Sequence, residues 1–218
     1  MEERDLKLMA AQFRKPKGEL GIQVGEFMNQ GNGRINYDAL QILKAGNEDR
    51  ILEIGMGNGY FVSEILEKNS KVKYTGCEIS DEMVEEALKI NEKYIKTKQA
   101  DFVKGNIRAL PFAKEAFDKI ITINTIYFWD DEMTALNELK RVLKPNGQLI
   151  ISLRPKHYLV NYPFTKYNFN LFSKDDVLTL LEKSQFKISQ VFENIEPPYD
   201  LQGEIVELEN IIIVASKN

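Results

Sequence analysis

The stretch ILEIGMGNGY at residues 51–60 says most about the fold of this 218-residue chain. An apolar run that carries one acid, Glu53, leads directly into three alternating glycines, Gly55, Gly57 and Gly59. Glycines let a backbone approach a ligand closely, because no Cβ stands in the way. The stretch therefore predicts a buried strand that ends in a loop for a nucleotide-like ligand.

The spacing of the glycines distinguishes between nucleotide ligands. A dinucleotide site needs G-x-G-x-x-G, but the sixth position from Gly55 is Tyr60, and no G-K-[ST] follows to form a P-loop. S-adenosylmethionine (SAM) has no phosphates and carries an ammonium and a sulfonium, so it suits the negative charge of Glu53, which would repel a pyrophosphate. Glu78 ends the next predicted strand, about 20 residues beyond the loop, where an acid can accept both ribose hydroxyls in NAD and SAM sites alike.

The rest of the chain alternates between strand and helix patterns. Predicted strands lie at 50–55, 72–79, 100–105, 117–124 and 148–154, and helices at 35–46, 60–69, 80–96 and 130–144. An aromatic loop at 155–172, a helix at 173–184 and strands at 185–194 and 206–217 complete the pattern. This order predicts an α/β fold: a Rossmann-like, doubly wound seven-stranded sheet, mostly parallel, with an antiparallel C-terminal hairpin.

Residues 1–34 differ from this alternation and are expected to form an N-terminal helical cap or lid on a single domain that occupies 35–218. LKLMAAQF has helical spacing, Pro16, Gly18 and Gly21 break it, and Gly31 and Gly33 mark a loop. The segment MNQGNGRINY then leads into the core and is expected to close over a bound ligand.

Four motifs in order carry a family resemblance: ILEIGMGNGYFVSEIL, YTGCEISDEMVEEA, DFVKGNIRALPF and LKRVLKPNGQLIIS. Over roughly residues 35–155 the chain resembles a class I SAM-dependent methyltransferase, most closely the small-molecule and quinone-type subgroup. The resemblance implies SAM as the cofactor, bound by the residues Glu53, Gly55, Gly57, Gly59, Glu78, Ile79, Met83, Asn106, Ile107 and Asn124.

These residues have separate implied roles along the cofactor. Glu53 and the glycines surround its methionine part and ribose, Glu78 binds the ribose, and Ile79 and Met83 flank the adenine. Met83 fits the core equally well by its helical spacing. Asn106 stands where the family usually has an Asp, and its side-chain carbonyl can still accept from the adenine amino group. Ile107 offers backbone contacts, and Asn124 lies under the sulfonium.

The reaction implied is transfer of a methyl group from SAM to a small-molecule acceptor by in-line displacement. The sequence assigns no catalytic residue, although Tyr37, Tyr127, Asp130 and His157 are candidate bases for an acceptor that must lose a proton. The lone His157 and the absence of a Cys/His/Asp cluster predict no metal site. Two alternatives stay open: a non-catalytic SAM-binding regulatory or assembly protein, and an NAD-dependent oxidoreductase.

Charge and composition predict the remaining partners. The net charge of −4, with Lys and Arg spread along the chain, argues against nucleic acid. No run of about 18 apolar residues is present to span a membrane. The single cysteine, Cys77, and the charged first residues predict a cytoplasmic protein. We expect a monomer or homodimer whose acceptor site lies between residues 1–34, the 155–172 loop and the sheet edge.

Overall fold

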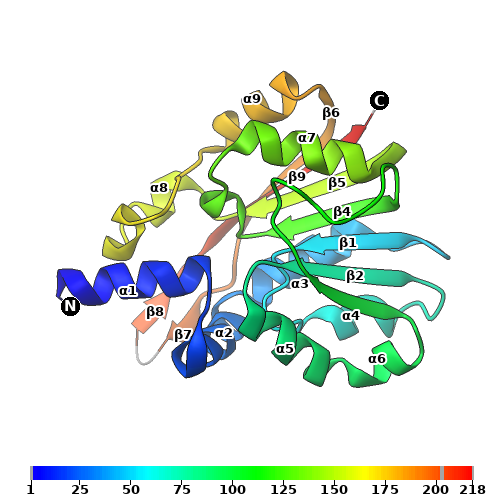
Figure 1. The fold of residues 1–218 in the computed structure, drawn as a ribbon. Helices are drawn as coiled ribbons and strands as arrows, with labels where there is room; N and C mark the ends of the chain where they lie inside the picture. The colour runs from blue at the N-terminus through cyan, green and yellow to red at the C-terminus, as the bar shows by residue number, and fades with distance from the viewer. Residues whose placement is uncertain (1, 202–203, 218) are drawn as a thin grey trace.

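A seven-stranded sheet forms the centre of the computed structural model, which describes residues 2–201 and 204–217 (Figure 1). Its spatial order is β3-β2-β1-β4-β5-β9-β6. Strands β1 to β5 run parallel, and β9 pairs antiparallel with both β5 and β6. The predicted fold class is thereby confirmed. The strands are β1 (Arg50–Ile54), β2 (Lys73–Glu78), β3 (Ala100–Lys104), β4 (Phe117–Ile123), β5 (Leu143–Leu153), β6 (Phe186–Ile195) and β9 (Glu209–Lys217).

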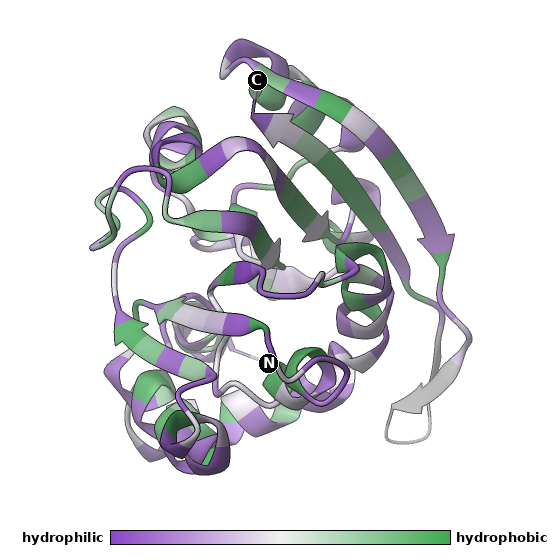
Figure 2. Cartoon of the chain, turned by 90° about the vertical axis from the view of Figure 1, so that its right-hand side faces the viewer, coloured by the Kyte–Doolittle hydropathy of each residue, from purple (hydrophilic) through white to green (hydrophobic). Residues whose placement is uncertain are grey.

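Helices cover both faces of the sheet, which explains the near-continuous apolar runs of the strands. Neighbouring residues of β4 show this: Ile120 packs into one hydrophobic cluster and Ile121 into the other, and both are fully buried. In Figure 2 some strands of the sheet carry long hydrophobic stretches, whereas others alternate with hydrophilic residues. One cluster includes residues of α7 (Glu132–Val142) and α9 (Lys174–Lys183). The other includes residues of α3 (Gly33–Leu43), α4 (Val62–Leu66), α5 (Asp81–Ile90) and α6 (Glu92–Lys96).

The N-terminal helices α1 (Glu3–Arg14) and α2 (Gly18–Gly31) lie at the edge where the parallel strands end (Figure 1). Two hydrogen bonds attach the turn between them to the start of α5. The Ser80 hydroxyl donates to the carbonyl oxygen of Pro16, and the Gly18 N–H donates to the Glu82 carboxylate at 2.7 Å. The first segment of the chain is therefore fixed against the second βα unit.

The structure corrects the expected loop before residue 35. Helix α2 runs through Gly21 and Gly25, and Gly33 already belongs to α3, so only Asn32 separates the two helices. Close packing explains why glycines occur inside α2. A Cβ at Gly21 would lie 2.7 Å from the Pro16 carbonyl carbon, and one at Gly25 would lie 2.9 Å from the Met83 sulfur. The tight contacts with neighbouring segments outweigh the weak helix propensity of glycine.

Several other elements differ from the predicted boundaries. The predicted helix 80–96 is divided at Asn91, whose buried side chain donates to the carbonyl oxygens of Gly59 and Ala87. The predicted helices at 60–69 and 130–144 are shorter, and β5 begins at Leu143. The predicted loop 155–172 contains α8 (Lys156–Leu159) and the 3-10 helix η2 (Pro163–Lys166), and a further 3-10 helix, η1 (Ile126–Phe128), follows β4. The expected linker before the last strand contains a two-stranded pairing of β7 (Tyr199–Leu201) with β8 (Glu204–Val206).

Within residues 2–201 and 204–217, no helix is both long and apolar enough to cross a membrane.

The predicted cap of α9 is present in the structure and generates a stability prediction. Ser173 Oγ accepts from the Asp176 N–H, and the Asp176 carboxylate accepts from the Ser173 N–H at 2.8 Å, which forms a capping box. Ser173→Ala should lower the free energy of unfolding by about 1 kcal/mol, because the first turn loses a satisfied donor. Chemical denaturation measures it. Ser63→Ala inside α4 is the control and should be neutral or slightly stabilising.

Candidate functional site

A cavity lies at the carboxyl ends of β1, β2, β3 and β4. Nine of the ten residues proposed from the sequence to bind the cofactor line it. These are Glu53, Gly55, Gly57, Glu78, Ile79, Met83, Asn106, Ile107 and Asn124. The parallel strands bring them together because their carboxyl ends share one edge of the sheet.

The glycine loop after β1 shapes the floor of this cavity. Gly55 has φ +72°, and a Cβ there would collide with the Thr125 side chain. Gly57 has φ +57°, and a Cβ there would meet nothing within 4 Å, so its backbone faces open space where a ligand can approach. Gly59 does not line the cavity. Its missing side chain instead makes room for α5, since a Cβ would lie 3.1 Å from the Cβ of Ala87.

Glu78 is buried at the end of β2, with 7% of its surface exposed. One carboxylate oxygen accepts from the Ile79 and Ser80 N–H groups at 2.7 and 3.0 Å, and the other lies 3.4 Å from the Gly57 nitrogen. Burial raises the pKa of Glu78, and the backbone donors oppose that rise. The carboxylate is thus held by backbone groups while its second oxygen faces the glycine loop.

Glu53 lies one strand away and is equally buried. It accepts a hydrogen bond of 2.7 Å from the hydroxyl of Tyr74, which comes from β2. The pKa of Glu53 is raised to about 7: burial is the main cause, the Tyr74 hydrogen bond lowers the pKa, and the charge of the nearby Glu78 adds a smaller rise. A cationic ligand beside Glu53 would favour the ionised form, whereas an anionic ligand would suppress it.

The opposite end of the cavity carries Ile79, Met83 and Asn106. Met83 is almost fully buried and also packs beneath Gly25, so it is a core residue and a cavity residue at once. The Asn106 side-chain oxygen accepts from the Arg108 N–H at 3.0 Å, which fixes its orientation within the turn after β3. This oxygen retains a second lone pair for a ligand donor.

Asn124 ends β4 in a left-handed conformation, with φ +55°. Its amide nitrogen donates to the side-chain oxygen of Asn32, between α2 and α3, at 3.1 Å. Its amide oxygen lies 3.1 Å from the Tyr127 hydroxyl, which donates to it. Asn124 therefore connects the sheet edge with the N-terminal helices.

Of the four candidate bases, Asp130 alone lines the cavity, and it forms an ion pair with Arg14 at the end of α1. The Tyr127 hydroxyl is occupied by the backbone of Arg154, and burial raises the pKa of Tyr127. His157 is 69% exposed and bonds to Glu209, away from the cavity.

Neither Tyr37, the remaining candidate base, nor Cys77 is suited to reactive chemistry at the cavity. Tyr37 is half exposed, and Arg34 lies over its ring. Cys77 touches the cavity, but burial raises the pKa of its thiol to about 12, so the thiol stays protonated. Among the described residues, no group of three His, Cys, Asp or Glu is arranged to hold a metal ion.

Several cavity residues were not identified from the sequence, and some of them come from the N-terminal segment. They include Arg14, Asn29, Asn32, Asn36, Asn58 and Thr125. Asn29, Asn32 and Asn36 recur at helical spacing, so this face would have been recognisable had the segment been predicted as helical. The glycines of α2 obscured that signal.

Comparison with known proteins supports the reading of the motifs. Residues 52–151 match the protein family described as a methyltransferase domain. The chain is 29% identical over 132 residues to an uncharacterized methyltransferase, YdaC, of Bacillus subtilis, which covers 61% of this chain and 71% of that protein. It is also 29% identical over 189 residues to a tRNA (guanine-N(7)-)-methyltransferase of Clostridium botulinum, covering 78% of this chain and 82% of that one.

Solved structures agree with this match. A SAM-dependent methyltransferase from Thermotoga maritima, described as a possible histamine N-methyltransferase, superposes with a TM-score of 0.69 at 26% identity, covering 96% of this chain and all of that one (100%). A chain of the Haloferax volcanii complex between the Trm112 activator and a methyltransferase reaches 0.77 at 16% identity, covering 98% and 97%, and shows the fold alone. Together the comparisons confirm the family resemblance and the predictions of an enzyme that uses SAM.

The raised pKa of Glu53 predicts a pH-dependent stability. Between pH 4.5 and about 7 the folded protein holds a proton on Glu53 that the unfolded chain releases. The contribution of this residue to stability therefore declines as the pH rises through that window. Glu53→Gln removes the titrating group, so the variant should gain up to about 3 kcal/mol over wild type at pH 8 and little at pH 4.5. Urea denaturation of both ligand-free proteins across this range measures the difference, and parallel curves would contradict the assignment.

Proposed function

We propose that this chain, a class I SAM-dependent methyltransferase, transfers the methyl group of SAM to a small-molecule acceptor by in-line displacement. The observation that carries the proposal is the order of the cavity residues along the sheet. Glu53 and the glycine loop follow β1, Glu78 ends β2, Asn106 follows β3 and Asn124 follows β4. An extended ligand lying across these ends meets a different chemical environment at each strand.

Each part of SAM has a proposed partner in this order. The adenine lies over β3, where Asn106 accepts from its amino group and Ile79, Met83 and the Ile107 backbone enclose the ring. Glu78 accepts from the ribose hydroxyls at the end of β2. The methionine part follows the glycine loop, with its ammonium near Glu53. The sulfonium then points towards Asn124 and the end of β4.

The chemistry proposed at this position is a single displacement. A lone pair of the acceptor attacks the methyl carbon, the carbon–sulfur bond breaks, and its electrons remain on sulfur to give S-adenosylhomocysteine. The protein contributes mainly by holding the acceptor in line with that bond in a site that excludes water. No covalent enzyme intermediate is needed.

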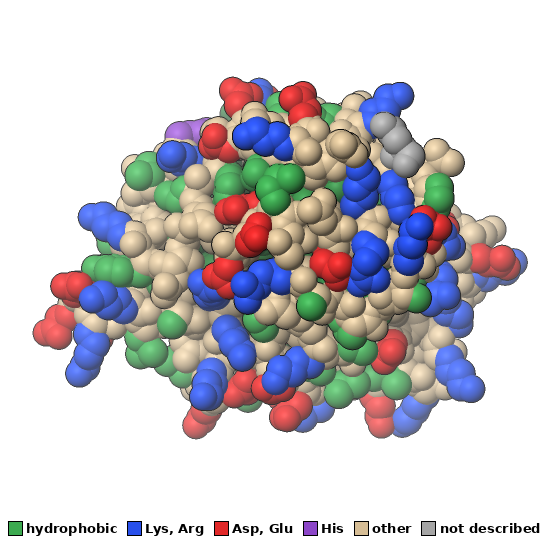
Figure 3. All heavy atoms as spheres, turned by 45° about the horizontal axis from the view of Figure 1, so that its top comes forward, with side chains coloured by type: hydrophobic (Ala, Val, Ile, Leu, Met, Phe, Trp, Pro, Cys, Tyr) green, Lys and Arg blue, Asp and Glu red, His purple; other side chains and the backbone are tan. Residues whose placement is uncertain are grey.

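The walls beyond Asn124 favour a small acceptor. The Phe13 ring of α1 lies 5.0 Å from the Phe164 ring of η2, and the Arg14–Asp130 ion pair joins α1 to the segment after β4. The sequence also carries a net charge of −4, and Figure 3 shows Lys and Arg side chains interspersed with Asp and Glu side chains on the face drawn. A polynucleotide such as the tRNA methylated by the clostridial relative would be better served by a continuous basic surface.

Residues 1–34 are proposed to act as a cap on the domain formed by 35–218. At the cavity, polar contacts join this segment to the rest of the chain, among them the Arg14–Asp130 pair, the Asn32–Asn124 bond and the Ser80–Pro16 bond. Such contacts suit a segment that opens to admit ligands.

The cofactor assignment predicts the effect of a single-atom change at Glu78. Glu78→Gln should weaken binding of S-adenosylhomocysteine about 10-fold to 100-fold, because the ribose hydroxyls lose a charged acceptor. Isothermal titration calorimetry measures the affinity. Glu64→Gln on the exposed side of α4 is the matched control and should bind like wild type. Equal affinities for the Glu78→Gln variant and wild type would contradict the proposed cofactor orientation.

The acceptor class is tested by transfer of a radiolabelled methyl group. SAM carrying the label is incubated with the protein and either the small-molecule fraction of a cell extract or total tRNA. Label should enter a low-molecular-weight product and leave the tRNA unlabelled. Transfer to tRNA alone would overturn the proposed acceptor, and SAM binding without transfer in any fraction would favour a non-catalytic SAM-binding protein.

A further inference from the structure

The end of the cavity at Asn124 contains three side-chain amides, and the proposed cofactor contacts involve little of their hydrogen-bonding capacity. These amides belong to Asn32, Asn36 and Asn124. β4 lies beside β1 in the sheet, so a cofactor whose adenine lies over β3 directs its methyl group to this end. This step rests on the proposed function. The amides therefore lie at the end of the cavity where methyl transfer is proposed.

Arg154 holds this amide cluster from two sides. It follows β5 and is buried, with 7% of its surface exposed. Its guanidinium donates to the buried Glu196 carboxylate at 2.9 Å and to the Gly31 carbonyl oxygen, at the end of α2, at 3.1 Å. Its backbone N–H donates to the Tyr127 hydroxyl, and this hydroxyl donates to Asn124 Oδ1 at 3.1 Å. One residue thus fixes both the end of α2 and the end of β4.

The two sides meet at Asn32. This residue follows Gly31 directly, and its side-chain oxygen accepts from Asn124 Nδ2 at 3.1 Å. Asn36, one turn along α3, donates from its Nδ2 to the Asn32 carbonyl oxygen at 2.8 Å. Asn36 is 7% exposed and lines the cavity, and its Oδ1 makes no hydrogen bond within the described part of the chain. Because Asn36 lines the cavity, this amide oxygen is available to accept a hydrogen bond from a ligand.

We propose that Arg154 is a positioning residue for methyl transfer, and that the amide oxygens of this cluster recognise an acceptor nitrogen that carries a hydrogen. A neutral amine already has the lone pair that forms the new carbon–nitrogen bond, so no base is needed before attack. As the carbon–sulfur bond breaks, positive charge develops on nitrogen and its N–H becomes a stronger donor to the amide oxygens. The proton then leaves to water from the methylated product.

The charges near the cavity agree with this acceptor class. Asp130, the candidate base that lines the cavity, is already paired with Arg14. The other two carboxylates of the cavity, Glu53 and Glu78, are assigned above to the ammonium and the ribose of the cofactor, so a hydroxyl acceptor has no free carboxylate there to take its proton. Amide oxygens are too weakly basic to serve in its place, but they accept hydrogen bonds from nitrogen well.

Sinefungin tests the inference without knowledge of the acceptor. This SAM analogue carries an amino group in place of the methyl-bearing sulfonium, so it puts N–H donors at the point of transfer. Calorimetry with wild type should show about tenfold tighter binding of sinefungin than of S-adenosylhomocysteine. Arg154→Lys keeps a positive charge beside Glu196, but its single ammonium group cannot also bond to the Gly31 carbonyl oxygen. It should lose most of this preference, while its affinity for S-adenosylhomocysteine stays within about twofold.

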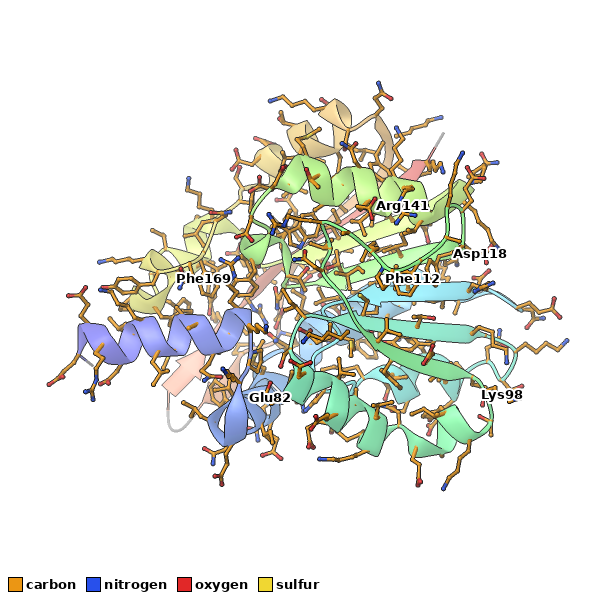
Figure 4. All side chains as sticks on the ribbon, viewed as in Figure 1. Glu82, Lys98, Phe112, Asp118, Arg141 and Phe169 are labelled. Carbon is orange, nitrogen blue, oxygen red and sulfur yellow. The ribbon has the colours of Figure 1, made fainter. Side chains whose placement is uncertain are left out.

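Arg141→Lys provides a matched control for the loss of a forked arginine. Arg141 pairs with Glu138 at 2.7 Å and donates to the carbonyl oxygens of Phe112 and Leu110. It lies at the opposite edge of the sheet from Phe169 and the N-terminal helices (Figure 4). Its variant should keep the wild-type preference. Tyr127→Phe, which keeps the ring packing and removes the hydroxyl that orients Asn124, should lower the preference without unfolding the protein.

Three outcomes would overturn the inference. Equal weakening of both ligands in Arg154→Lys would assign Arg154 a structural role alone. An unchanged preference in both Arg154→Lys and Tyr127→Phe would show that the amide cluster does not face the point of transfer. Failure of wild type to bind either ligand would overturn the proposed function, and this inference with it.

Discussion

The burial of two carboxylates at neighbouring strand ends is the constraint on which the site depends. Glu53 and Glu78 are each less than 8% exposed, and within the described part of the chain neither forms an ion pair with a lysine or arginine. Burial raises the pKa of both, and the charge of Glu78 raises the pKa of Glu53 further, whereas backbone donors and the charge of Lys15 oppose the rise at Glu78. A ligand that supplies hydroxyl donors and positive charge relieves this cost, so the site favours a cation such as SAM over a phosphate-bearing nucleotide.

The parallel sheet converts that local constraint into an ordered site. Because β3, β2, β1 and β4 are consecutive neighbours, their carboxyl ends present an amide, a carboxylate, a glycine turn with a carboxylate, and a second amide in a row. The fold thereby sets the direction in which an extended cofactor lies. In the proposed function the acceptor is recognised by the N-terminal helices and the segment after β5, which lie outside the four motifs.

The buried Arg154–Glu196 pair links these two parts of the protein. A buried ion pair is weak evidence for stability, because desolvation offsets most of its attraction. It is a better device for position, since a forked guanidinium fixes several partners at once. Here the partners are Gly31 of α2, Glu196 directly after β6 and Glu209 of β9, and Asn210 donates to both Glu196 and Asp38 of α3. The network therefore fixes the position of the end of α2, where residues 1–34 join the rest of the chain.

The sequence by itself determined the strands of the sheet, their mostly parallel arrangement and the edge of the sheet at which the glycine–acid motif lies. Three kinds of local signal made this possible: the near-continuous apolar runs of the strands, the helix caps Ser80 and Ser173, and the glycine–acid motif. Each helix or strand that these signals predict is present. Such signals depend on neighbouring residues alone, so they can be read along the chain. The loop interpretation of α2 failed because its glycines serve contacts with Pro16 and Met83, which no local pattern reveals.

Only the tertiary structure decided which residues meet across the cavity. Asn32 and Asn124 are 92 positions apart, and Arg154 and Gly31 are 123 apart, yet both pairs are hydrogen-bonded. The tertiary structure also places Gly59 outside the cavity wall. His157 and Tyr37 do not line the cavity either, so neither is a candidate base at the site. The physical reason is that strand order and helix packing, which are set by burial of the whole chain, determine these distances, and a sequence pattern records only spacing along the backbone.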